Sequence, residues 1–401
     1  MKIVADENIP YVKEAFGSLG EVVTLPGRRV DAASVRDAEM LLVRSITAVN
    51  SALLEGSNVR FVGTATIGTD HVDEEYLESR GIAFASAPGS NANSVAEYIV
   101  AALLTLAGRK NFRLKGKIIG VIGVGNCGSR VVKKAEALGM KVLLNDPPLQ
   151  RQTGDLKYRP IEELLNADIL TLHVPLTHEG IDSTYHLVGE AFLKRLRPEC
   201  ILINTSRGAV VDNQALLSAL DSGKINGAVL DVWENEPTID LDLLDRVDQG
   251  TSHIAGYSLD GKANATMMLY EAACSFLGAE PRLDVSSVLP EPDCARIECR
   301  DVTSGQASGR DDEDTIADVV RAVYDIERDD AALRELHDVG PGDRAASFDR
   351  LRKEYPVRRE FHNTEVILPC SRGDSGLAKA LGGLGFRVKQ LSGGSSHPLR
   401  K

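Results

Sequence analysis

The fold is decided by one stretch of the chain, Lys117-Ile118-Ile119-Gly120-Val121-Ile122-Gly123-Val124-Gly125-Asn126-Cys127-Gly128. An apolar strand pattern runs directly into a G-x-G-x-x-G turn, and a helical pattern follows from Ser129. Gly123 permits the tight turn, Gly125 lets the backbone approach a pyrophosphate, and Gly128 lets the helix pack closely on the strand. The helix N-terminus offers free N–H groups and the positive end of its dipole to an anion. The stretch therefore predicts a dinucleotide-binding turn.

The acid that ends the next predicted strand indicates which dinucleotide binds. Asp146 lies 146 − 128 = 18 residues beyond the last glycine, about where an acid accepts the ribose hydroxyls. A carboxylate at this position repels a 2′-phosphate, so the sequence favours NAD over NADP. The alternative is a tight turn in a sheet that binds no ligand, with Asp146 merely capping a loop.

Strand and helix patterns alternate on both sides of this turn, which predicts parallel β/α units. Strands are expected at residues 2–5, 22–25, 40–43, 60–63, 82–85, 117–122, 141–145, 169–174, 200–204 and 227–231. A long helix is expected at 91–109, capped by Asn93 or Ser94, and another at 264–276. Near the C-terminus, Ile316, Val319, Val320 and Val323 share one helical face, and strands are expected at 364–368 and 386–391. That apolar face suits either a subunit interface or a small private core.

Length and composition are those of an ordinary globular chain. Its 401 residues exceed what one hydrophobic core usually organises, so two or three domains are expected. The net charge of −12 disfavours a nucleic-acid or anionic-membrane partner, although a local arginine cluster can still hold a small anion. The six cysteines lack metal-ligand or disulfide spacing, and acids stand where a signal peptide would be apolar. We therefore expect no metal site, no membrane or nucleic-acid partner, and a cytoplasmic location.

Polar side chains follow three further predicted strands, at the edge where open α/β sheets bind ligands. Arg207, Glu236 and His253 are the candidates. Oxidation of a secondary alcohol needs a base for the hydroxyl proton, and histidine titrates in the right range. A neighbouring carboxylate orients the imidazole and favours its charged form, while a guanidinium holds a substrate carboxylate and polarises the forming carbonyl.

These segments resemble the D-isomer-specific 2-hydroxyacid dehydrogenases, from the N-terminus to about Pro281. The resemblance implies an α/β fold in which a Rossmann-type NAD-binding domain, residues 93–257, is inserted in a split flavodoxin-like catalytic domain, residues 1–92 and 258–284. A dinucleotide turn that begins at Gly123 rather than near residue 10 fits this insertion. Residues 285–401 would form a C-terminal α/β dimerisation domain, so the resemblance also implies a homodimer.

The resemblance assigns site residues position by position. It implies that Arg207 and Glu236 are the active-site pair and that His253 transfers the proton. The implied cofactor contacts are Gly123, Gly125, Asn126, Cys127, Gly128, Asp146, Val174, Thr205, Ser206, Arg207, Asp231 and Gly256. The implied substrate contacts are Ser45, Thr66 and Tyr257. Val174 stands where the family often carries a threonine, so only a backbone contact is expected there.

Further segments, at residues 5–10, 43–47, 63–71 and 253–258, resemble one branch of this family along nearly the whole chain. That resemblance implies oxidation of a small phosphorylated hydroxy acid, 4-phospho-D-erythronate, to its 2-oxo acid by NAD, as a step of pyridoxal 5′-phosphate synthesis. Arg44, or an arginine within residues 344–359 of a second subunit, is a hypothetical ligand for the substrate phosphate. The alternative for Arg44 is an ordinary surface arginine.

Two rival functions share these motifs. A dehydrogenase acting on 3-phosphoglycerate usually ends in a regulatory βαββαβ domain, which the pattern after residue 284 does not resemble. A co-repressor-like NAD sensor uses this fold without turnover, but the full set of Arg207, Glu236 and His253 argues against it. We interpret the other histidines as structural and expect Glu234, the rival of Glu236, to be solvated. The tail 392–401 does not match the branch.

Overall fold

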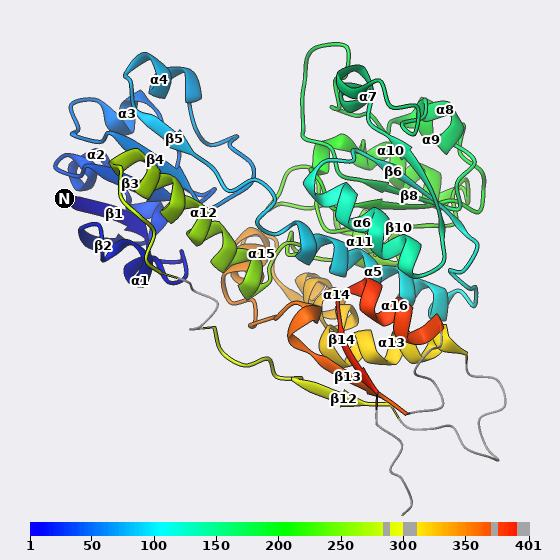
Figure 1. The fold of residues 1–401 in the computed structure, drawn as a ribbon. Helices are drawn as coiled ribbons and strands as arrows, with labels where there is room; N and C mark the ends of the chain where they lie inside the picture. Colours follow the sequence, from blue (N-terminus) through cyan, green and yellow to red (C-terminus); the bar gives the residue numbers. More distant parts are fainter. Residues whose placement is uncertain (284–288, 300–310, 370–375, 391–401) are drawn as a thin grey trace, which may run out of the picture. The chain divides into compact units, whose positions relative to one another are not determined.

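The structure is a computed structural model that describes residues 1–283, 289–299, 311–369 and 376–390. The chain divides into two compact units, each built from two segments. The first unit comprises Met1–Asn93 and Tyr257–Pro290, and the second comprises Ser94–Gly256 and the described residues from Glu291 onward (Figure 1). The first segment of the second unit is therefore inserted in the sequence of the first unit.

A five-stranded parallel sheet forms the centre of the first unit, in the order β2-β1-β3-β4-β5. Its strands are β1 Lys2–Asp6, β2 Glu21–Leu25, β3 Met40–Val43, β4 Phe61–Thr64 and β5 Ala83–Ala85. The helices are α1 Val12–Phe16, α2 Ala32–Val35, α3 Ser51–Leu54, α4 Glu74–Ser79 and the returning α12 Leu259–Leu277, with a 3₁₀ turn at Gly27–Arg29. This strand order is the flavodoxin-like one. The return of α12 is enforced by packing, because Leu269 and Tyr270 share a buried cluster with Ile3 and Phe16.

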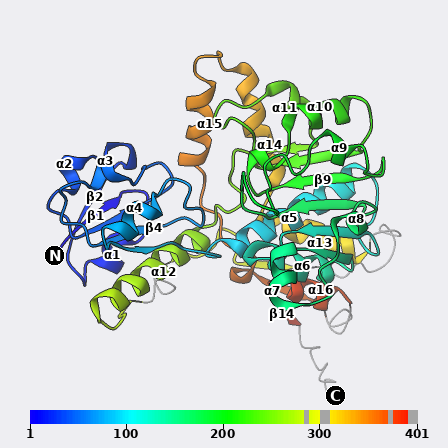
Figure 2. The same ribbon diagram turned by 90° about the horizontal axis from the view of Figure 1, so that it is seen from above.

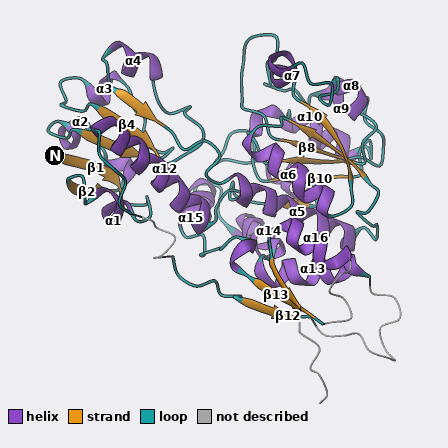
Figure 3. Ribbon diagram, viewed as in Figure 1, coloured by secondary structure: helices purple, strands orange, loops and turns teal. Residues whose placement is uncertain are grey.

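The second unit contains a six-stranded parallel sheet in the order β11-β10-β9-β8-β6-β7. Its strands are β6 Ile118–Ile122, β7 Lys141–Asn145, β8 Ile169–Leu172, β9 Ile201–Asn204, β10 Gly227–Leu230 and β11 Gln249–Gly250. The helices here are α5 Ala92–Arg109, α6 Asn126–Ala137, α7 Pro147–Thr153, α8 Ile161–Leu164, α9 Glu190–Leu193, α10 Asn213–Asp221 and α11 Leu241–Arg246, with a 3₁₀ turn at Gly208–Val210. Helices cover both faces of this sheet (Figure 3). The strand order reverses between β6 and β8, which is the Rossmann switch point at which dinucleotides bind.

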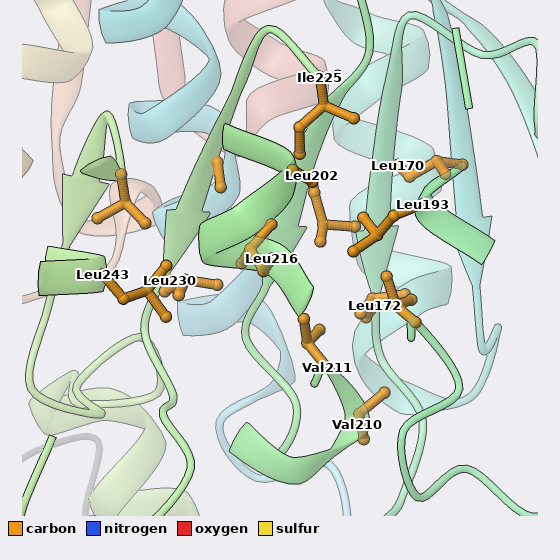
Figure 4. Close-up of a cluster of buried hydrophobic side chains, with 14 of the residues drawn as sticks. Leu170, Leu172, Leu193, Leu202, Val210, Val211, Leu216, Ile225, Leu230 and Leu243 are labelled. Carbon is orange, nitrogen blue, oxygen red and sulfur yellow. The ribbon is translucent and has the colours of Figure 1, made fainter. Parts of the chain in front are cut away.

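The core of this unit follows from the uninterrupted apolar strands, because parallel strands buried on both faces carry few polar residues. Leu170, Leu172, Leu202 and Leu230 meet Leu216 of α10 and their neighbours in one buried cluster (Figure 4). Each such leucine contributes about 1.5–3 kcal/mol relative to an exposed one. Leu333, Leu336 and Phe348 of the C-terminal segment belong to the same cluster. The C-terminal segment therefore completes the core of the nucleotide-binding fold.

The C-terminal segment adds a parallel three-stranded sheet in the order β12-β13-β14. Its strands are β12 Arg296–Glu298, β13 Glu365–Leu368 and β14 Arg387–Gln390, and its helices are α13 Asp312–Val323, α14 Ile326–Arg334, α15 Arg344–Lys353 and α16 Gly376–Leu384, with 3₁₀ turns at Glu335–Asp338 and Phe361–Asn363 (Figure 1). The four helices are also labelled in Figure 2. The strands expected at 364–368 and 386–391 are confirmed within the described residues, but β12 was not predicted. Whether residues 285–401 form a dimerisation domain stays a prediction, and the tail 392–401 lies outside the described residues.

Two local predictions are decided by side-chain burial in α13 and by the residue at which α5 begins. Ile316, Val319 and Val320 of α13 are at most 4% exposed in the single chain, so their apolar face serves a private core. The prediction that Asn93 or Ser94 caps the long helix is wrong, because α5 already begins at Ala92. The Ser94 hydroxyl instead donates to Oε1 of Glu360 at 2.7 Å, a residue of the C-terminal segment that no local pattern brings close.

Candidate active site

The glycine turn between β6 and α6 has the geometry that its spacing predicts. Gly123 has a φ of 85°, and a Cβ there would lie 2.7 Å from the carbonyl oxygen of His173. A Cβ on Gly128 would lie 2.0 Å from the carbonyl oxygen of Gly123. Gly125 precedes α6 and faces open space, and both it and Asn126 are exposed. The turn thus presents the free N-terminus of a twelve-residue helix, which suits a pyrophosphate.

Asp146 follows β7 and lies directly beside the glycine turn. Its Oδ2 accepts a hydrogen bond from the amide of Val124 at 2.8 Å, and its Oδ1 accepts one from the amide of Leu149 at 3.0 Å. The carboxylate therefore both caps α7 and borders the turn. Asp146 therefore has the capping role of the alternative interpretation, and it also lies close enough to the glycine turn to bind a ribose.

The other predicted cofactor residues line the carboxyl ends of neighbouring strands. Val174, after β8, lies 2.9 Å from where a Cβ of Gly123 would stand. Burial raises the pKa of the Cys127 thiol to about 11, and the charge of Arg207 acts in the opposite direction. Arg207 therefore lies near enough to the glycine turn to act on its cysteine.

We interpreted His173 as structural, and in the structure its ring contacts the hydroxyl of Thr205 and helps to position it. Its ring bridges the hydroxyl of Thr171 (3.0 Å from Nε2) and that of Thr205 (3.4 Å from Nδ1). Burial lowers the pKa of His173 to about 3, so the ring is neutral near pH 7. A histidine that directly follows an apolar parallel strand is the sequence signal for such a support.

Arg207 stands on a turn that Asn204 shapes. The Oδ1 of Asn204, which is fully buried, accepts from the amide of Ser206 at 3.0 Å and from its hydroxyl at 2.8 Å, and its Nδ2 donates to the Arg207 carbonyl at 2.9 Å. This is the Asx-turn geometry of an asparagine at a strand end. Gly208 is required next, because a Cβ there would lie 1.9 Å from the carbonyl oxygen of Trp233. Asn204 was not among the predicted site residues, although its place before Thr-Ser-Arg is a recognisable turn signal.

Glu236 and His253 form the expected pair. Nδ1 of His253 lies 2.8 Å from Oε2 of Glu236, whose Oε1 accepts from the amide of Trp233 at 2.7 Å. Burial, the largest single effect, acts to raise the pKa of the Glu236 carboxyl, but the interactions with His253 and the other favourable contacts together lower it. The Trp233 amide and the charge of Arg352 in α15 act in the same lowering direction. The carboxylate is thus ionised and holds the imidazole by one nitrogen, which leaves Nε2 for proton transfer.

Comparisons with known proteins now decide the family. The chain is 47% identical over 401 residues, all of both chains, to the erythronate-4-phosphate dehydrogenase of Cronobacter sakazakii. It is 46% identical to that of Escherichia coli K12 over 389 residues, 97% of this chain and 98% of the relative. The chain belongs to the D-isomer-specific 2-hydroxyacid dehydrogenases. Residues 102–255 match the model of the NAD-binding domain of this family, and residues 296–382 match a domain described as of unknown function.

Solved structures agree with the assignment of this 2-hydroxyacid dehydrogenase. A D-lactate dehydrogenase of Aquifex aeolicus, complexed with NAD and lactic acid, is 28% identical with a TM-score of 0.57 and covers 69% of this chain and 96% of its own. An NAD-dependent formate dehydrogenase of Staphylococcus aureus, in complex with NAD, is 25% identical with a TM-score of 0.57 and covers 71% and 98%. The Rossmann-type domain inserted in a split flavodoxin-like one is thereby confirmed.

One prediction about the carboxylates of this dehydrogenase is wrong. Glu234 was expected to be solvated, but its side chain is only 19% exposed. Its Oε1 lies 2.7 Å from Nε2 of His186, and its Oε2 accepts from the amide of Asn213 at 2.9 Å. Glu234 therefore joins the start of α10 to the loop after β10, while Glu236 points to His253.

The predicted substrate residues belong to the first unit. The hydroxyl of Thr66 donates to the Gly68 carbonyl at 2.9 Å and lies 2.7 Å from the hydroxyl of Thr64, which in turn contacts Nε2 of His71 at 2.9 Å. Ser45 is exposed and follows Arg44 at the end of β3. The ring of Tyr257 lies 4.4 Å from the ammonium of Lys262. Their role as substrate contacts stays a prediction.

Among the described residues, no helix is long and apolar enough to span a membrane. Over the same residues, no group of three or more His, Cys, Asp or Glu side chains is arranged to hold a metal ion.

Proposed function

We propose that this dehydrogenase oxidises 4-phospho-D-erythronate to (R)-3-hydroxy-2-oxo-4-phosphonooxybutanoate with NAD, as a step of pyridoxal 5′-phosphate synthesis. The main support for an alcohol oxidation is the 2.8 Å contact between His253 and an ionised Glu236, at the carboxyl end of the Rossmann-type sheet. The name of the full-length relatives supports the substrate.

Three residues of the second unit have separate roles in the proposed reaction. Nε2 of His253 accepts the proton of the C2 hydroxyl, and Glu236 stabilises the resulting imidazolium and keeps the ring oriented. The guanidinium of Arg207 binds the substrate carboxylate and the oxygen that becomes the carbonyl. When bound, NAD supplies the acceptor for the C2 hydride.

The cradle for NAD combines the exposed start of α6, the glycines at 123, 125 and 128, and Asp146. The remaining proposed contacts are Asn126, Cys127, Val174, Thr205, Ser206, Arg207, Asp231 and Gly256. Gly125 supports this assignment most directly, because open space lies where its side chain would stand.

Ser45, Thr66 and Tyr257 are proposed to contact the substrate, and Arg44 to bind its phosphate. The resemblance to the branch supports the roles of Ser45, Thr66 and Tyr257 and a homodimer. Arg44 is proposed because the substrate carries a phosphate dianion and other basic clusters are scarce in the sequence, and the cysteine pattern supports a cytoplasmic location. The apolar face of α13 does not contribute to that proposal, because the chain buries it internally.

The substrate is tested by an absorbance assay at 340 nm. The purified full chain with NAD is expected to form NADH from 4-phospho-D-erythronate and none from 3-phosphoglycerate. A 2-oxo acid acceptor is included in a parallel reaction, since bound NADH could otherwise stop the reaction after one turnover. Oxidation of 3-phosphoglycerate instead would support the rival dehydrogenase, and NADH binding without turnover on either substrate would support the sensor.

Asp146→Ser is expected to weaken NAD binding about tenfold and to reduce the preference for NAD over NADP by about 10–100-fold, since a charged hydrogen bond is worth about 1.5–3 kcal/mol. Serine can still cap α7, so the loss reports the ribose contact rather than helix stability. Asp240→Ser is the matched control, because Asp240 caps α11 in the same way. Dissociation constants by fluorescence titration check both variants, and an unchanged NAD/NADP ratio in Asp146→Ser would contradict the assignment.

A further inference from the structure

The loop that carries His253 has a backbone conformation that its surroundings must maintain. His253 has a φ of 59°, in the left-handed region that non-glycine residues rarely adopt. Such a conformation costs of order 1–3 kcal/mol and persists only where neighbouring groups hold it. The groups that hold residues 250–256 therefore determine where the imidazole points.

Part of that support comes from the nucleotide-binding fold itself. The carbonyl of Asp231 accepts from the amide of His253 at 2.7 Å, and its carboxylate accepts from the amides of Ile254 at 2.7 Å and Ala255 at 3.0 Å. The Thr251 hydroxyl donates to the same carboxylate at 2.6 Å and lies 2.8 Å from the hydroxyl of Tyr98 in α5. Asp231 is thus the inner clamp of the loop.

The other part of the support comes from the C-terminal segment. Nη2 of Arg358 donates to the carbonyl of Ala255 at 2.7 Å, and Oδ1 of Asp330 accepts from the amide of Gly250 at 2.7 Å. These two bonds hold the loop at both of its ends. Arg358 contacts Ala255, two residues after His253, although 103 positions separate Arg358 from Ala255 in the sequence.

Arg358 is costly to bury. It is 6% exposed, its guanidinium lies 4.2 Å from the centre of the Tyr324 ring, and within the described residues its Nε and Nη1 have no hydrogen-bond partner. Leaving buried donors unmet costs about 1–3 kcal/mol each, which offsets what one charged hydrogen bond contributes to stability. The charge of Arg358 also acts favourably on the buried carboxylates Glu97 and Asp329, and the hydrogen bond that its guanidinium donates goes to the Ala255 carbonyl of the His253 loop.

We propose that Arg358 is a positioning residue for the reaction, which fixes the left-handed loop of His253 by binding the carbonyl of Ala255. The C-terminal segment then serves turnover. Arg352 of α15 acts toward the same site, because its charge favours the ionised form of Glu236. The kinetic test of this proposal rests on the proposed function, because it measures turnover. The hydrogen-exchange test depends only on the contacts of the loop.

The kinetic test compares Arg358→Met with Arg109→Met in the full-length enzyme. Arg109 donates to the carbonyl of Asp248 at 2.8 Å, so it is an arginine-to-carbonyl contact just before β11 and outside the loop. Arg358→Met is expected to lower kcat about 10–100-fold, the size of a displaced catalytic group, while KM for NAD and the Kd for NADH change less than about twofold. Arg109→Met is expected to keep kcat within about twofold of the parent. A kcat of folded Arg358→Met within twofold of the parent would overturn the proposal.

Arg358→Lys keeps the test decisive if the methionine variant does not fold. The ammonium retains the charge and can donate to the Ala255 carbonyl, but it loses the planar contact with Tyr324. We expect kcat to fall about three- to tenfold, since the bond is kept with poorer geometry. An unchanged kcat would again reject the role.

Hydrogen exchange provides a measurement that needs no substrate. In Arg358→Met, the peptide covering residues 250–257 is expected to exchange at least about tenfold faster. The loop loses the hydrogen bond to the Ala255 carbonyl, so the bonds from the Ile254 and Ala255 amides to Asp231 open more often. Arg109→Met is expected to leave this peptide unchanged. Unaltered exchange in Arg358→Met would overturn the inference. Absence of 4-phospho-D-erythronate oxidation by the parent would instead overturn the proposed function.

Discussion

Replacement of His253 by asparagine is expected to reduce kcat by about 10²–10⁴-fold, because a positioned general base supplies a factor of that order. Asparagine tolerates the left-handed φ of 59° better than most residues, so the loop should keep its hydrogen bonds. The Kd for NADH is expected to stay within about twofold, since the imidazole is not assigned to the cofactor. Steady-state kinetics with 4-phospho-D-erythronate, together with NADH fluorescence titration, check both values.

His186 provides a closely matched control. It also has a positive φ, of 49°, and its Nε2 also contacts a carboxylate, Oε1 of Glu234 at 2.7 Å. His186→Asn should keep kcat within about threefold of the parent, because that pair joins two loops and is assigned no proton transfer. If both variants lost activity equally, loop stability rather than acid–base chemistry would explain the effect of His253→Asn.

The glycine turn should respond in opposite ways at two positions only three residues apart. Gly128→Ala is expected to destabilise the enzyme by about 2–3 kcal/mol, since the new methyl would stand 2.0 Å from the Gly123 carbonyl oxygen and force α6 away from β6. Gly125→Ala is expected to change stability by less than about 1 kcal/mol, because its methyl would meet open space. Its Kd for NAD is expected to rise at least about tenfold, since the methyl occupies the approach of the pyrophosphate.

Thermal unfolding and NAD titration of the two variants separate these effects. Gly340→Ala, whose methyl would also meet open space and whose φ is not positive, controls for the added methyl without a nearby cofactor. A Gly125→Ala protein that binds NAD as tightly as the parent would show that the pyrophosphate does not approach this glycine. A Gly128→Ala protein as stable as the parent would show that helix and strand can separate without cost.

Local patterns predicted most of the nucleotide-binding fold because its signals are short in range. A strand of buried aliphatic residues, a glycine turn and a helix are specified within about twenty residues. The strand ends at Arg207, Glu236 and His253 were predictable for the same reason, since parallel strands bring their carboxyl ends to one edge. The Asx turn of Asn204 follows the same local rules, although it was not predicted.

Glu234 and Ser94 were mispredicted because their partners are distant in sequence. Nothing near Glu234 indicates that His186 and the amide of Asn213 will bind it. Likewise, the local context of Ser94 favours a helix cap, whereas in the folded chain its hydroxyl donates a hydrogen bond to Glu360. Long-range polar contacts of this kind have no periodicity that a pattern could detect.

By itself, the sequence determined the glycine turn of the cofactor site and predicted which polar residues follow the strands, because glycine spacing and residue type act over short stretches. Only the tertiary structure decided how the imidazole of His253 is held. Its left-handed loop is fastened by Asp231 from one strand end and by Arg358 and Asp330 from a segment about a hundred residues later. Burial in a shared core brings those groups together, and burial is a property of the folded chain rather than of any one stretch of it.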